Sequence, residues 1–325
     1  MSNIEVVGLG ALNIDHMYRV ERILVDGEAV VDELHSFSGG SAANTIYGLA
    51  KLGVNTGYTG VIGGDAGGKI LLRNFQLVGV DTSKIRIKRG VMTGSVLCLS
   101  DKLGQRSLYV VPGVNSLMTI DDLDLTYINQ AKWLHLSSFA DDTQFEVLLE
   151  LMNRLDSSVN LSFSPGVLHS NKKVAVLKPI LSRTTILFVN QHEIQHLTQK
   201  DIVAGAELCL RQGCHMVVVT LGKGMILKLG QRTVNAVCYI RGADGEYVVE
   251  PISPDVISEI DSTGAGDAFA AGFLYGTLNG KQPYDCGCIG DLVARLSLTK
   301  LGAREGLPNF TKLAQYYHKY YNKEL

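Results

Sequence analysis

Residues 261–273, DSTGAGDAFAAGF, join a small, polar, glycine-rich stretch to a run of alanine, phenylalanine and glycine. The first half is typical of a loop and the second half of a closely packed helix. A glycine-rich turn that leads into a helix leaves backbone N–H groups without partners, and the helix dipole points the same way, so such a turn binds anions. We therefore expect Gly264, Ala265 and Gly266 to approach a phosphate group, with Asp267 in the first helical turn beside it.

A carboxylate at this place has two interpretations. As a general base, Asp267 would accept the proton of an attacking hydroxyl while the loop N–H groups stabilise the charge on a transferring phosphoryl group. As an ordinary helix N-cap, the same residue would contribute about 1 kcal/mol to helix stability and have no chemical role. The loop alone leaves both interpretations open.

The elements that must position this loop follow an alternating pattern. Strands are predicted at 4–10, 132–138, 160–164, 184–190 and 216–222, and helices at 42–52, 143–155, 201–212 and 284–300. Near-continuous apolar strands with helices between them predict an α/β fold, a doubly wound and mostly parallel sheet covered by helices on both faces. In such a sheet, ligands bind beyond the carboxyl ends of the strands.

Two regions break this alternation. Residues 16–37 and 94–113 each read as two strands joined by a turn, with no helix between them. We expect them to form a small antiparallel sheet that acts as a lid on one domain spanning 1–325. Because an exposed sheet edge is commonly covered by a partner, we also expect a homodimer formed through this lid.

A second glycine-led turn into a helix, GGSAANTIYGLAKLG, lies far upstream at 39–53. Together with DSTGAGDAFAAGF it resembles the two signature regions of the PfkB, or ribokinase-like, family of sugar and nucleoside kinases. The resemblance extends in order along nearly the whole chain, and its TGAGD signature is highly specific. Its other pieces are ALNID (11–15), VIGGDAGG (61–68), NQHE (190–193), TLGKG (220–224) and LGAREGLP (301–308).

The resemblance implies a role for each matching position in an ATP-dependent kinase that uses Mg²⁺. Asp267 would be the general base, with Gly264, Ala265 and Gly266 as the anion hole. The acceptor would be bound by Asn13, Asp15, Gly39, Gly40, Asn44 and Asn115. The nucleotide would be bound by Asn190, Thr220, Gly222 and Gly224, with Glu193 organising Mg²⁺ through water. Asp261 and Thr263 match positions that hold a monovalent cation such as K⁺ in some members.

Two classes of acceptor stay open, a nucleoside and a sugar. ALNID, NQHE and LGAREGLP resemble the archaeal-type nucleoside kinases more closely, which favours a nucleoside. The alternative is a free-sugar kinase of the ribokinase, fructokinase or 2-keto-3-deoxygluconate kinase type. A nucleoside would need an apolar or aromatic slot for its base, which Tyr18, Phe37, Tyr109 and Val111 on the lid could line, although lid packing is the preferred interpretation of these residues. A phosphosugar would need a basic cluster, for which Arg106 is the one candidate.

Two hypotheses come from other classes of protein. HEIQH (192–196) matches the zinc-hydrolase motif HExxH, which needs both histidines on one face of a helix and a third ligand elsewhere. His192 and His196 otherwise read as solvent-facing residues. The second hypothesis is a sensor that keeps the fold without chemistry, against which the intact TGAGD argues. The chain also departs from the family in a long segment at about 233–252, which reads as an extra hairpin.

Composition excludes several other classes. The net charge is −2 and the pI about 6.4, which do not mark a nucleic-acid or membrane-surface binder. No apolar run approaches the ~20 residues of a membrane span, and no signal peptide is visible, so we expect a cytoplasmic protein acting on small molecules. The six cysteines are scattered and read as buried or half-buried thiols.

Overall fold

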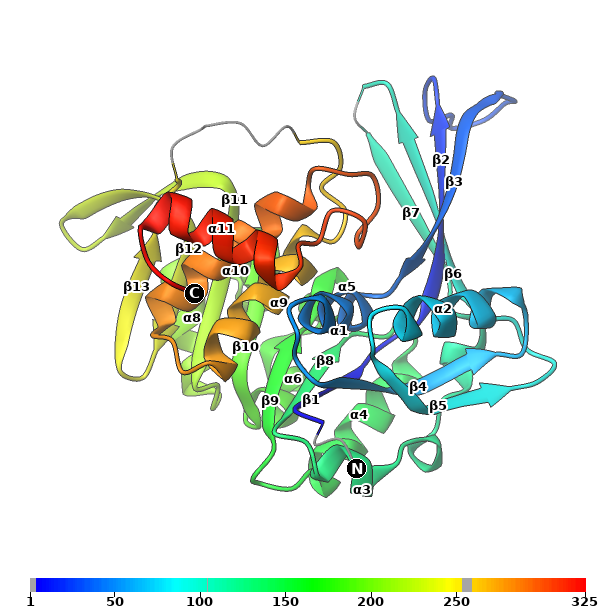
Figure 1. Cartoon of the computed structure of the whole chain (residues 1–325), viewed down its shortest axis with the longest axis horizontal. Helices are drawn as coiled ribbons and strands as arrows, with labels where there is room; N and C mark the ends of the chain where they lie inside the picture. Colours follow the sequence, from blue (N-terminus) through cyan, green and yellow to red (C-terminus); the bar gives the residue numbers. More distant parts are fainter. Residues whose placement is uncertain (1–3, 104, 253–258) are drawn as a thin grey trace.

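A nine-stranded sheet crosses the molecule, and a four-stranded sheet projects from one end of it (Figure 1). The computed structural model describes residues 4–103, 105–252 and 259–325. The large sheet has the order β13-β12-β11-β10-β9-β8-β1-β4-β5. Its strands are β1 (Val6–Leu9), β4 (Thr56–Gly63), β5 (Asp81–Lys88), β8 (Trp133–Ser137), β9 (Asn160–Ser164), β10 (Thr184–Asn190), β11 (Met216–Leu229), β12 (Arg232–Gly242) and β13 (Gly245–Val249).

The strand directions confirm the predicted mostly parallel sheet. Every pair from β5 through β11 is parallel, and β12 and β13 add an antiparallel edge. The five strands predicted from apolar runs are β1, β8, β9, β10 and β11. The predicted extra hairpin is β12 and β13, which turn at residues 242–245.

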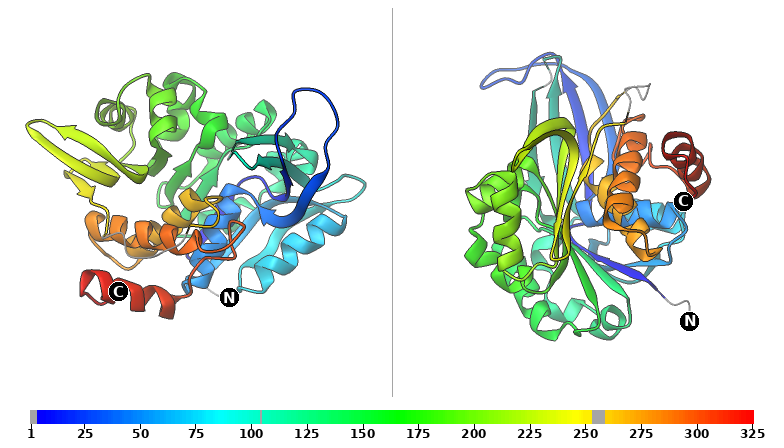
Figure 2. Two further views of the ribbon diagram at one scale, coloured as in Figure 1. Left: turned by 90° about the horizontal axis from the view of Figure 1, so that it is seen from above. Right: turned by 90° about the vertical axis from the view of Figure 1, so that its left-hand side faces the viewer.

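Helices cover both faces of this sheet, as Figure 2 shows in its right-hand view. One face packs against α1 (Ser41–Lys51), α2 (Ala66–Gln76), α9 (Ala265–Leu278), α10 (Pro283–Ser297) and α11 (Phe310–Tyr321). The other packs against α3 (Leu125–Asn129), α4 (Asp142–Arg154), α6 (Val174–Leu181), α7 (Gln191–Thr198) and α8 (Ile202–Arg211). A short helix, α5 (Gly166–Ser170), follows β9. The doubly wound arrangement is thereby confirmed, with one hydrophobic core on each side.

Close packing of α1 against α9 brings the two glycine-led turns together. A Cβ built on Gly48 of α1 would lie 2.8 Å from the Cβ of Ala271 of α9, so the helices meet where one has no side chain. Both helices begin at the carboxyl edge of the sheet. Residues 41–45 of α1 therefore reach the first turn of α9, although more than 220 residues separate them in the chain.

The projecting sheet is the predicted lid. It consists of β2 (Asn13–Val20), β3 (Val31–Gly39), β6 (Gly94–Asp101) and β7 (Arg106–Val111), in the order β3-β2-β6-β7. Its two hairpins, β2–β3 and β6–β7, are antiparallel as expected, while the central pair β2–β6 is parallel. This pairing places both hairpins side by side above the carboxyl edge of the large sheet (Figure 1).

Two further features concern the chain as a whole. Within the described ranges, none of the helices has the length and apolarity that crossing a membrane would require. All six cysteines are buried free thiols, in agreement with the sequence-based interpretation.

Candidate active site

Asp267 lies in the first turn of α9, and its carboxylate is held by the start of α1. Ser41 Oγ donates to Asp267 Oδ1 at 2.7 Å, and Asn44 Nδ2 donates to Asp267 Oδ2 at 2.8 Å. The N-cap of α9 is Gly264, without a side-chain hydrogen bond. Asp267 therefore does not cap its own helix, and the N-cap interpretation of this residue is wrong. Its carboxylate is fixed by a neighbouring element, as a positioned reactive group must be.

The surroundings of Asp267 make it a better base than an ordinary aspartate. Burial raises its pKa to about 6, against the opposing effects of Ser41, Asn44 and the Arg304 guanidinium, while the charge of Glu193 raises it further. A general base is most effective when its pKa lies near the working pH. Asp267 is thus ionised at neutral pH and still basic enough to accept a proton.

The signature loop, residues 261–266, enters α9 through a left-handed residue. Gly264 has φ of 74°, and a Cβ there would lie 2.5 Å from the Cβ of Ala303, so only glycine fits. Ala265 N–H donates to Ser262 O at 3.2 Å and is already engaged. The first-turn N–H groups that follow have no acceptor within the helix. The N–H groups that remain for an anion are therefore those of Gly266 and Asp267 in the first turn, together with that of Gly264, which has no backbone acceptor among the described residues.

Asp261 holds this loop in shape. Its Oδ1 accepts from Thr263 N and Thr263 Oγ1 at 3.0 and 2.8 Å, and its Oδ2 accepts from Gly302 N at 2.9 Å. Thr263 Oγ1 also accepts from Arg106 Nη2 on the lid strand β7 at 3.0 Å. Asp261 and Thr263, which the resemblance associates with a monovalent cation, thus link three segments: the signature loop, residues 301–309 and the lid.

Asp15 on β2 faces the same region from the lid. Its Oδ1 is buried and has no hydrogen-bond partner among the described residues. A Cβ on Gly39 of the neighbouring strand would collide with this carboxylate, which explains the glycine at that position. Burial raises the pKa of Asp15 to about 6, opposed by the charges of Arg304 and Arg106. A buried, unpartnered carboxylate oxygen is an acceptor that awaits a donor from a ligand.

Asn13 and Asn115 are brought together at the root of the lid. Asn115 Nδ2 donates to Asn13 Oδ1 at 3.0 Å and to Leu12 O at 3.2 Å, and Leu12 N donates to Asn115 Oδ1 at 3.2 Å. Both ends of the Asn115 amide are therefore engaged by residues 12 and 13. This geometry gives Asn115 a part in holding the strand that carries Asp15.

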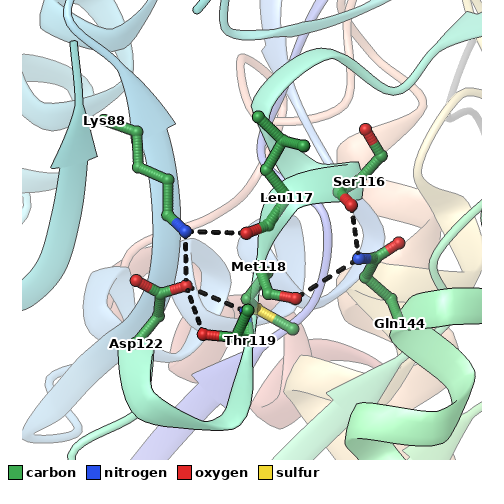
Figure 3. Close-up of polar contacts among 7 residues, drawn as sticks. All are labelled: Lys88, Ser116, Leu117, Met118, Thr119, Asp122 and Gln144. Atoms are coloured by element: carbon green, nitrogen blue, oxygen red, sulfur yellow. Dashed lines mark hydrogen bonds and ion pairs between the residues drawn. The ribbon is translucent and has the colours of Figure 1, made fainter.

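The segment that carries Asn115 is itself anchored from two sides (Figure 3). Gln144 Nε2 donates to the carbonyl groups of Ser116 and Met118 at 2.8 and 3.3 Å. Lys88 Nζ donates to Leu117 O at 2.7 Å and pairs with Asp122 at 2.7 Å. The chain leaving the lid is thus fixed to the main sheet and to α4.

Asn44 contacts Arg304, a buried arginine that the sequence did not reveal as part of this site. Asn44 is buried within α1, whose N-cap is Gly40 with φ of 102°. Its Oδ1 accepts from Arg304 Nε at 2.8 Å, so Asn44 bridges Arg304 and Asp267. Neither Arg304 nor Ser41 was singled out by sequence reasoning. The available signal was an arginine within LGAREGLP, a segment whose other residues, except Glu305, are small or apolar.

A pocket of about 910 Å³ adjoins the signature loop on the side of β11. Its walls include Thr220, Gly222, Lys223, Ala265, Gly266 and Phe269, with Asn235 and Val237 from β12. The strand β11 is irregular between Thr220 and Met225, where Gly222 and Gly224 have φ of 60° and 119°. The volume is sufficient for a nucleotide. The added hairpin thus contributes two side chains of β12 to this pocket.

Asn190 and Glu193 lie at the start of α7, one strand away. Asn190 pairs in register with Thr220, and the two residues form a capping box: Asn190 Oδ1 accepts from Glu193 N at 2.9 Å, and Glu193 Oε2 accepts from Asn190 N at 3.0 Å. His192 and His196 are exposed. Within the described residues, no three His, Cys, Asp or Glu side chains gather as a metal site, so HEIQH lacks the third ligand that the zinc hypothesis needs.

The register of the lid decides which side chains share the face of Asp15. Asp15 pairs with Phe37 and Val96, and Val96 pairs with Val110, so these residues lie on one face. By the same register Met17, Cys98, Leu108 and Arg106 belong to this inner face. Tyr18, Tyr109 and Val111 lie on the opposite, outer face. Of the predicted nucleobase slot, therefore, only Phe37 is placed correctly.

Comparison with known proteins finds similar proteins along nearly the whole chain. The model of the pfkB family of carbohydrate kinases matches residues 3–309. An uncharacterized sugar kinase of Archaeoglobus fulgidus is 36% identical over 80% of this chain and 98% of its own length. A cytidine kinase of Thermococcus kodakarensis is 30% identical over 92% of this chain and 98% of its own length. The structure of Arabidopsis thaliana ribokinase complexed with ribose and ATP is 23% identical, with a TM-score of 0.81 over 97% of this chain and 98% of that one.

Proposed function

The chain belongs to the pfkB family and is a sugar or nucleoside kinase, and from its site we propose that it transfers the γ-phosphoryl group of ATP to a hydroxyl of a nucleoside. The observation that carries the chemistry is the Asp267 carboxylate, fixed by Ser41 and Asn44 beside a helix N-terminus. This arrangement pairs a proton acceptor with an anion site in the way that phosphoryl transfer requires.

In the proposed reaction the acceptor lies between the lid and the carboxyl edge of the sheet. Asp15 accepts hydrogen bonds from its hydroxyl groups through the unpartnered oxygen. Asp267 accepts the proton of the attacking hydroxyl, and the N–H groups of Gly264 and Gly266 stabilise the charge on the transferring group. The bond from Arg106 on the lid to Thr263 of the signature loop brings the lid over this place and excludes water from it.

Asn190, Thr220, Gly222 and Gly224 are proposed to contact the nucleotide, for which the adjoining pocket has the room. Glu193 would help to hold Mg²⁺ through water, because its charge acts on Asp267 and the residue therefore lies near the reacting groups. The metal would supply charge neutralisation on the phosphate oxygens. Asp261 and Thr263 remain the proposed neighbours of a monovalent cation.

The inner face of the lid supports a nucleoside rather than a free sugar. Phe37, Met17, Val96, Leu108 and Val110 surround Asp15 on that face. Leu108 and Val110 are 60% and 41% exposed, so an apolar wall is open beside the polar group that would bind the ribose hydroxyls. A nucleobase would cover this wall, whereas a free sugar would leave it in water. The apolar outer face is the one on which we propose that a second copy of the chain packs.

The acceptor class can be tested by measuring ADP release with MgATP and a panel of acceptors. The panel holds adenosine, inosine, guanosine, cytidine, ribose, fructose, 2-keto-3-deoxygluconate and fructose 6-phosphate. We expect turnover with a nucleoside and much slower turnover with the sugars. Faster turnover with ribose or fructose would contradict the nucleoside assignment while leaving the kinase intact, and turnover with none would contradict the phosphotransfer itself.

The reaction should lose rate in acid. Because burial raises the pKa of Asp267 to about 6, the base becomes protonated as the pH falls through that value, and a protonated carboxyl cannot accept a proton. The carboxyl of Asp15, whose pKa is also raised to about 6, changes charge in the same range. We expect kcat/KM to be level above about pH 7 and to fall at the acid end by about tenfold per pH unit if one of these carboxylates must be ionised, and by about a hundredfold if both must be. A profile that is still level at about pH 5 would contradict the role given to Asp267.

A further inference from the structure

Arg304 is a buried cation at the junction of the lid, α1 and α2. It is 2% exposed and lies in the segment 301–309 that follows α10. Its guanidinium donates through Nε to Asn44 Oδ1 at 2.8 Å, through Nη1 to Asn74 Oδ1 at 2.6 Å, and through Nη2 to Gly39 O at 3.1 Å. The rings of Tyr47 and Phe75 lie 5.3 Å from its Cζ. The guanidinium group of Arg304 thus joins the lid strand β3, α1 and α2.

These partners are neutral, which is unusual for a buried arginine. Among the described residues no carboxylate forms an ion pair with Arg304, and burial lowers its pKa to about 10. A buried cation without a direct counter-ion is costly and is retained where its charge has a function. The carboxylates of Asp15 and Asp267 both respond to this charge, which lowers the pKa of each.

The bonded neighbours of Arg304 connect it to both carboxylates. Asn44 Oδ1 accepts a hydrogen bond from Arg304, and Asn44 Nδ2 donates one to Asp267. The arginine therefore fixes the orientation of the Asn44 amide. Gly39, whose carbonyl accepts from Arg304, is the residue against which the Asp15 carboxylate lies. The same guanidinium therefore reaches the Asp267 carboxylate through the Asn44 amide, and it binds the backbone of the residue that lies beside the Asp15 carboxylate.

We infer that Arg304 is a positioning residue that orients Asn44 toward Asp267 and keeps Asp267 and Asp15 ionised at neutral pH. The inference rests on the proposed function, since it concerns the acceptor and the base of that reaction. The groups that face Asp267 are Ser41 and Asn44 of α1, Glu193 of α7, Tyr58 of β4 and Arg304 itself. Arg304 is the cation of this set, so its removal should make both carboxylates harder to ionise.

The test is the pH profile of ADP release by Arg304→Met, Arg304→Lys and the control Lys51→Met. Lys51 Nζ donates to Leu307 O, so its loss loosens the same segment without removing a charge that acts on Asp267. For Arg304→Met we expect kcat to fall about tenfold or more and the acid limb of kcat/KM to move up by about one pH unit. For Lys51→Met, the acid limb of the kcat/KM profile should lie at the same pH as in the wild type.

Arg304→Lys separates charge from orientation and covers the case in which Arg304→Met does not fold. A lysine keeps the charge but cannot donate to three acceptors in a plane, so its acid limb should stay while kcat falls about tenfold. An unmoved limb in folded Arg304→Met, or a wild-type kcat in Arg304→Lys, would overturn the inference. A wild-type protein that releases no ADP with any acceptor would instead overturn the proposed function, and the inference with it.

Discussion

Replacement of Asp267 by asparagine should lower kcat by about 10²–10⁴, because the variant cannot take the proton of the attacking hydroxyl. The change is nearly isosteric. The amide oxygen can still accept from Asn44, and the Ser41 hydroxyl can turn to accept from the amide nitrogen, so the contacts that hold this side chain are retained. We therefore expect a folded protein with a defect in chemistry rather than in structure.

The affinity for ATP should be almost unchanged in Asp267→Asn, because the pocket that adjoins the signature loop is not altered. ADP release and calorimetric binding of ATP measure the two effects separately. Asp142→Asn is a matched control, since Asp142 is also an acid in the first turn of a helix but is fully exposed on α4. Turnover that survives in Asp267→Asn would exclude this residue as the base.

The sequence was sufficient for the sheet and for the glycine-led turn that carries Asp267. Apolar runs alternating with helices dictate a parallel sheet, and a glycine-led turn at a helix start is a local feature, so both can be recognised without knowing any contact. Asp267 was ambiguous from the loop alone. The two donors that hold its carboxylate, Ser41 and Asn44, lie more than 220 residues away in the chain.

Arg304 was missed for a related reason. Its partners Gly39, Asn44 and Asn74 lie 230 to 265 residues upstream, and an isolated arginine in a loop reads as a solvated side chain. The packing of three elements around residues 301–309 makes it a buried group. Only the small or apolar residues that flank the Arg304–Glu305 pair in LGAREGLP indicated that the segment is inside.

The nucleobase slot shows how register limits such reasoning. Tyr18 follows Asp15 by three residues, which in a strand places the two on opposite faces, and this could have been read from the sequence. For Tyr109 and Val111 the face depends on how β7 pairs with β6 and β6 with β2. A shift of one residue in either pairing would reverse the assignment, so the sequence could not decide it.

Replacement of Asp15 by alanine should have the second largest effect, and it should differ in kind from that of Asp267→Asn. A hydrogen bond to a charged group contributes about 1.5–3 kcal/mol, so the loss of two hydroxyl contacts should lower kcat/KM by about 10²–10⁴. Most of this loss should appear in KM, because Asp15 binds the acceptor in both the ground state and the transition state. The affinity for ATP should again be unchanged.

A matched control and a stability measurement distinguish lost binding from lost structure. Asp26→Ala removes another lid carboxylate, one that is exposed and accepts from Gly27 N. Burial raises the pKa of Asp15 in the folded state to about 6, above its ordinary value. Its ionised form therefore opposes folding above about pH 6, and this opposition fades as the pH falls below that value. Unliganded Asp15→Ala should therefore melt no lower than the wild type at neutral pH.

The decisive comparison combines the Asp15 variant with deoxy acceptors. If Asp15 accepts from the vicinal hydroxyls of the acceptor, removal of one hydroxyl should slow the wild type by about tenfold or more and should hardly affect Asp15→Ala. The coupling between side chain and hydroxyl isolates the contact from any general change in the lid. Equal losses in both proteins would show that the unpartnered oxygen of Asp15 does not meet the acceptor, and that another group on the inner face binds it.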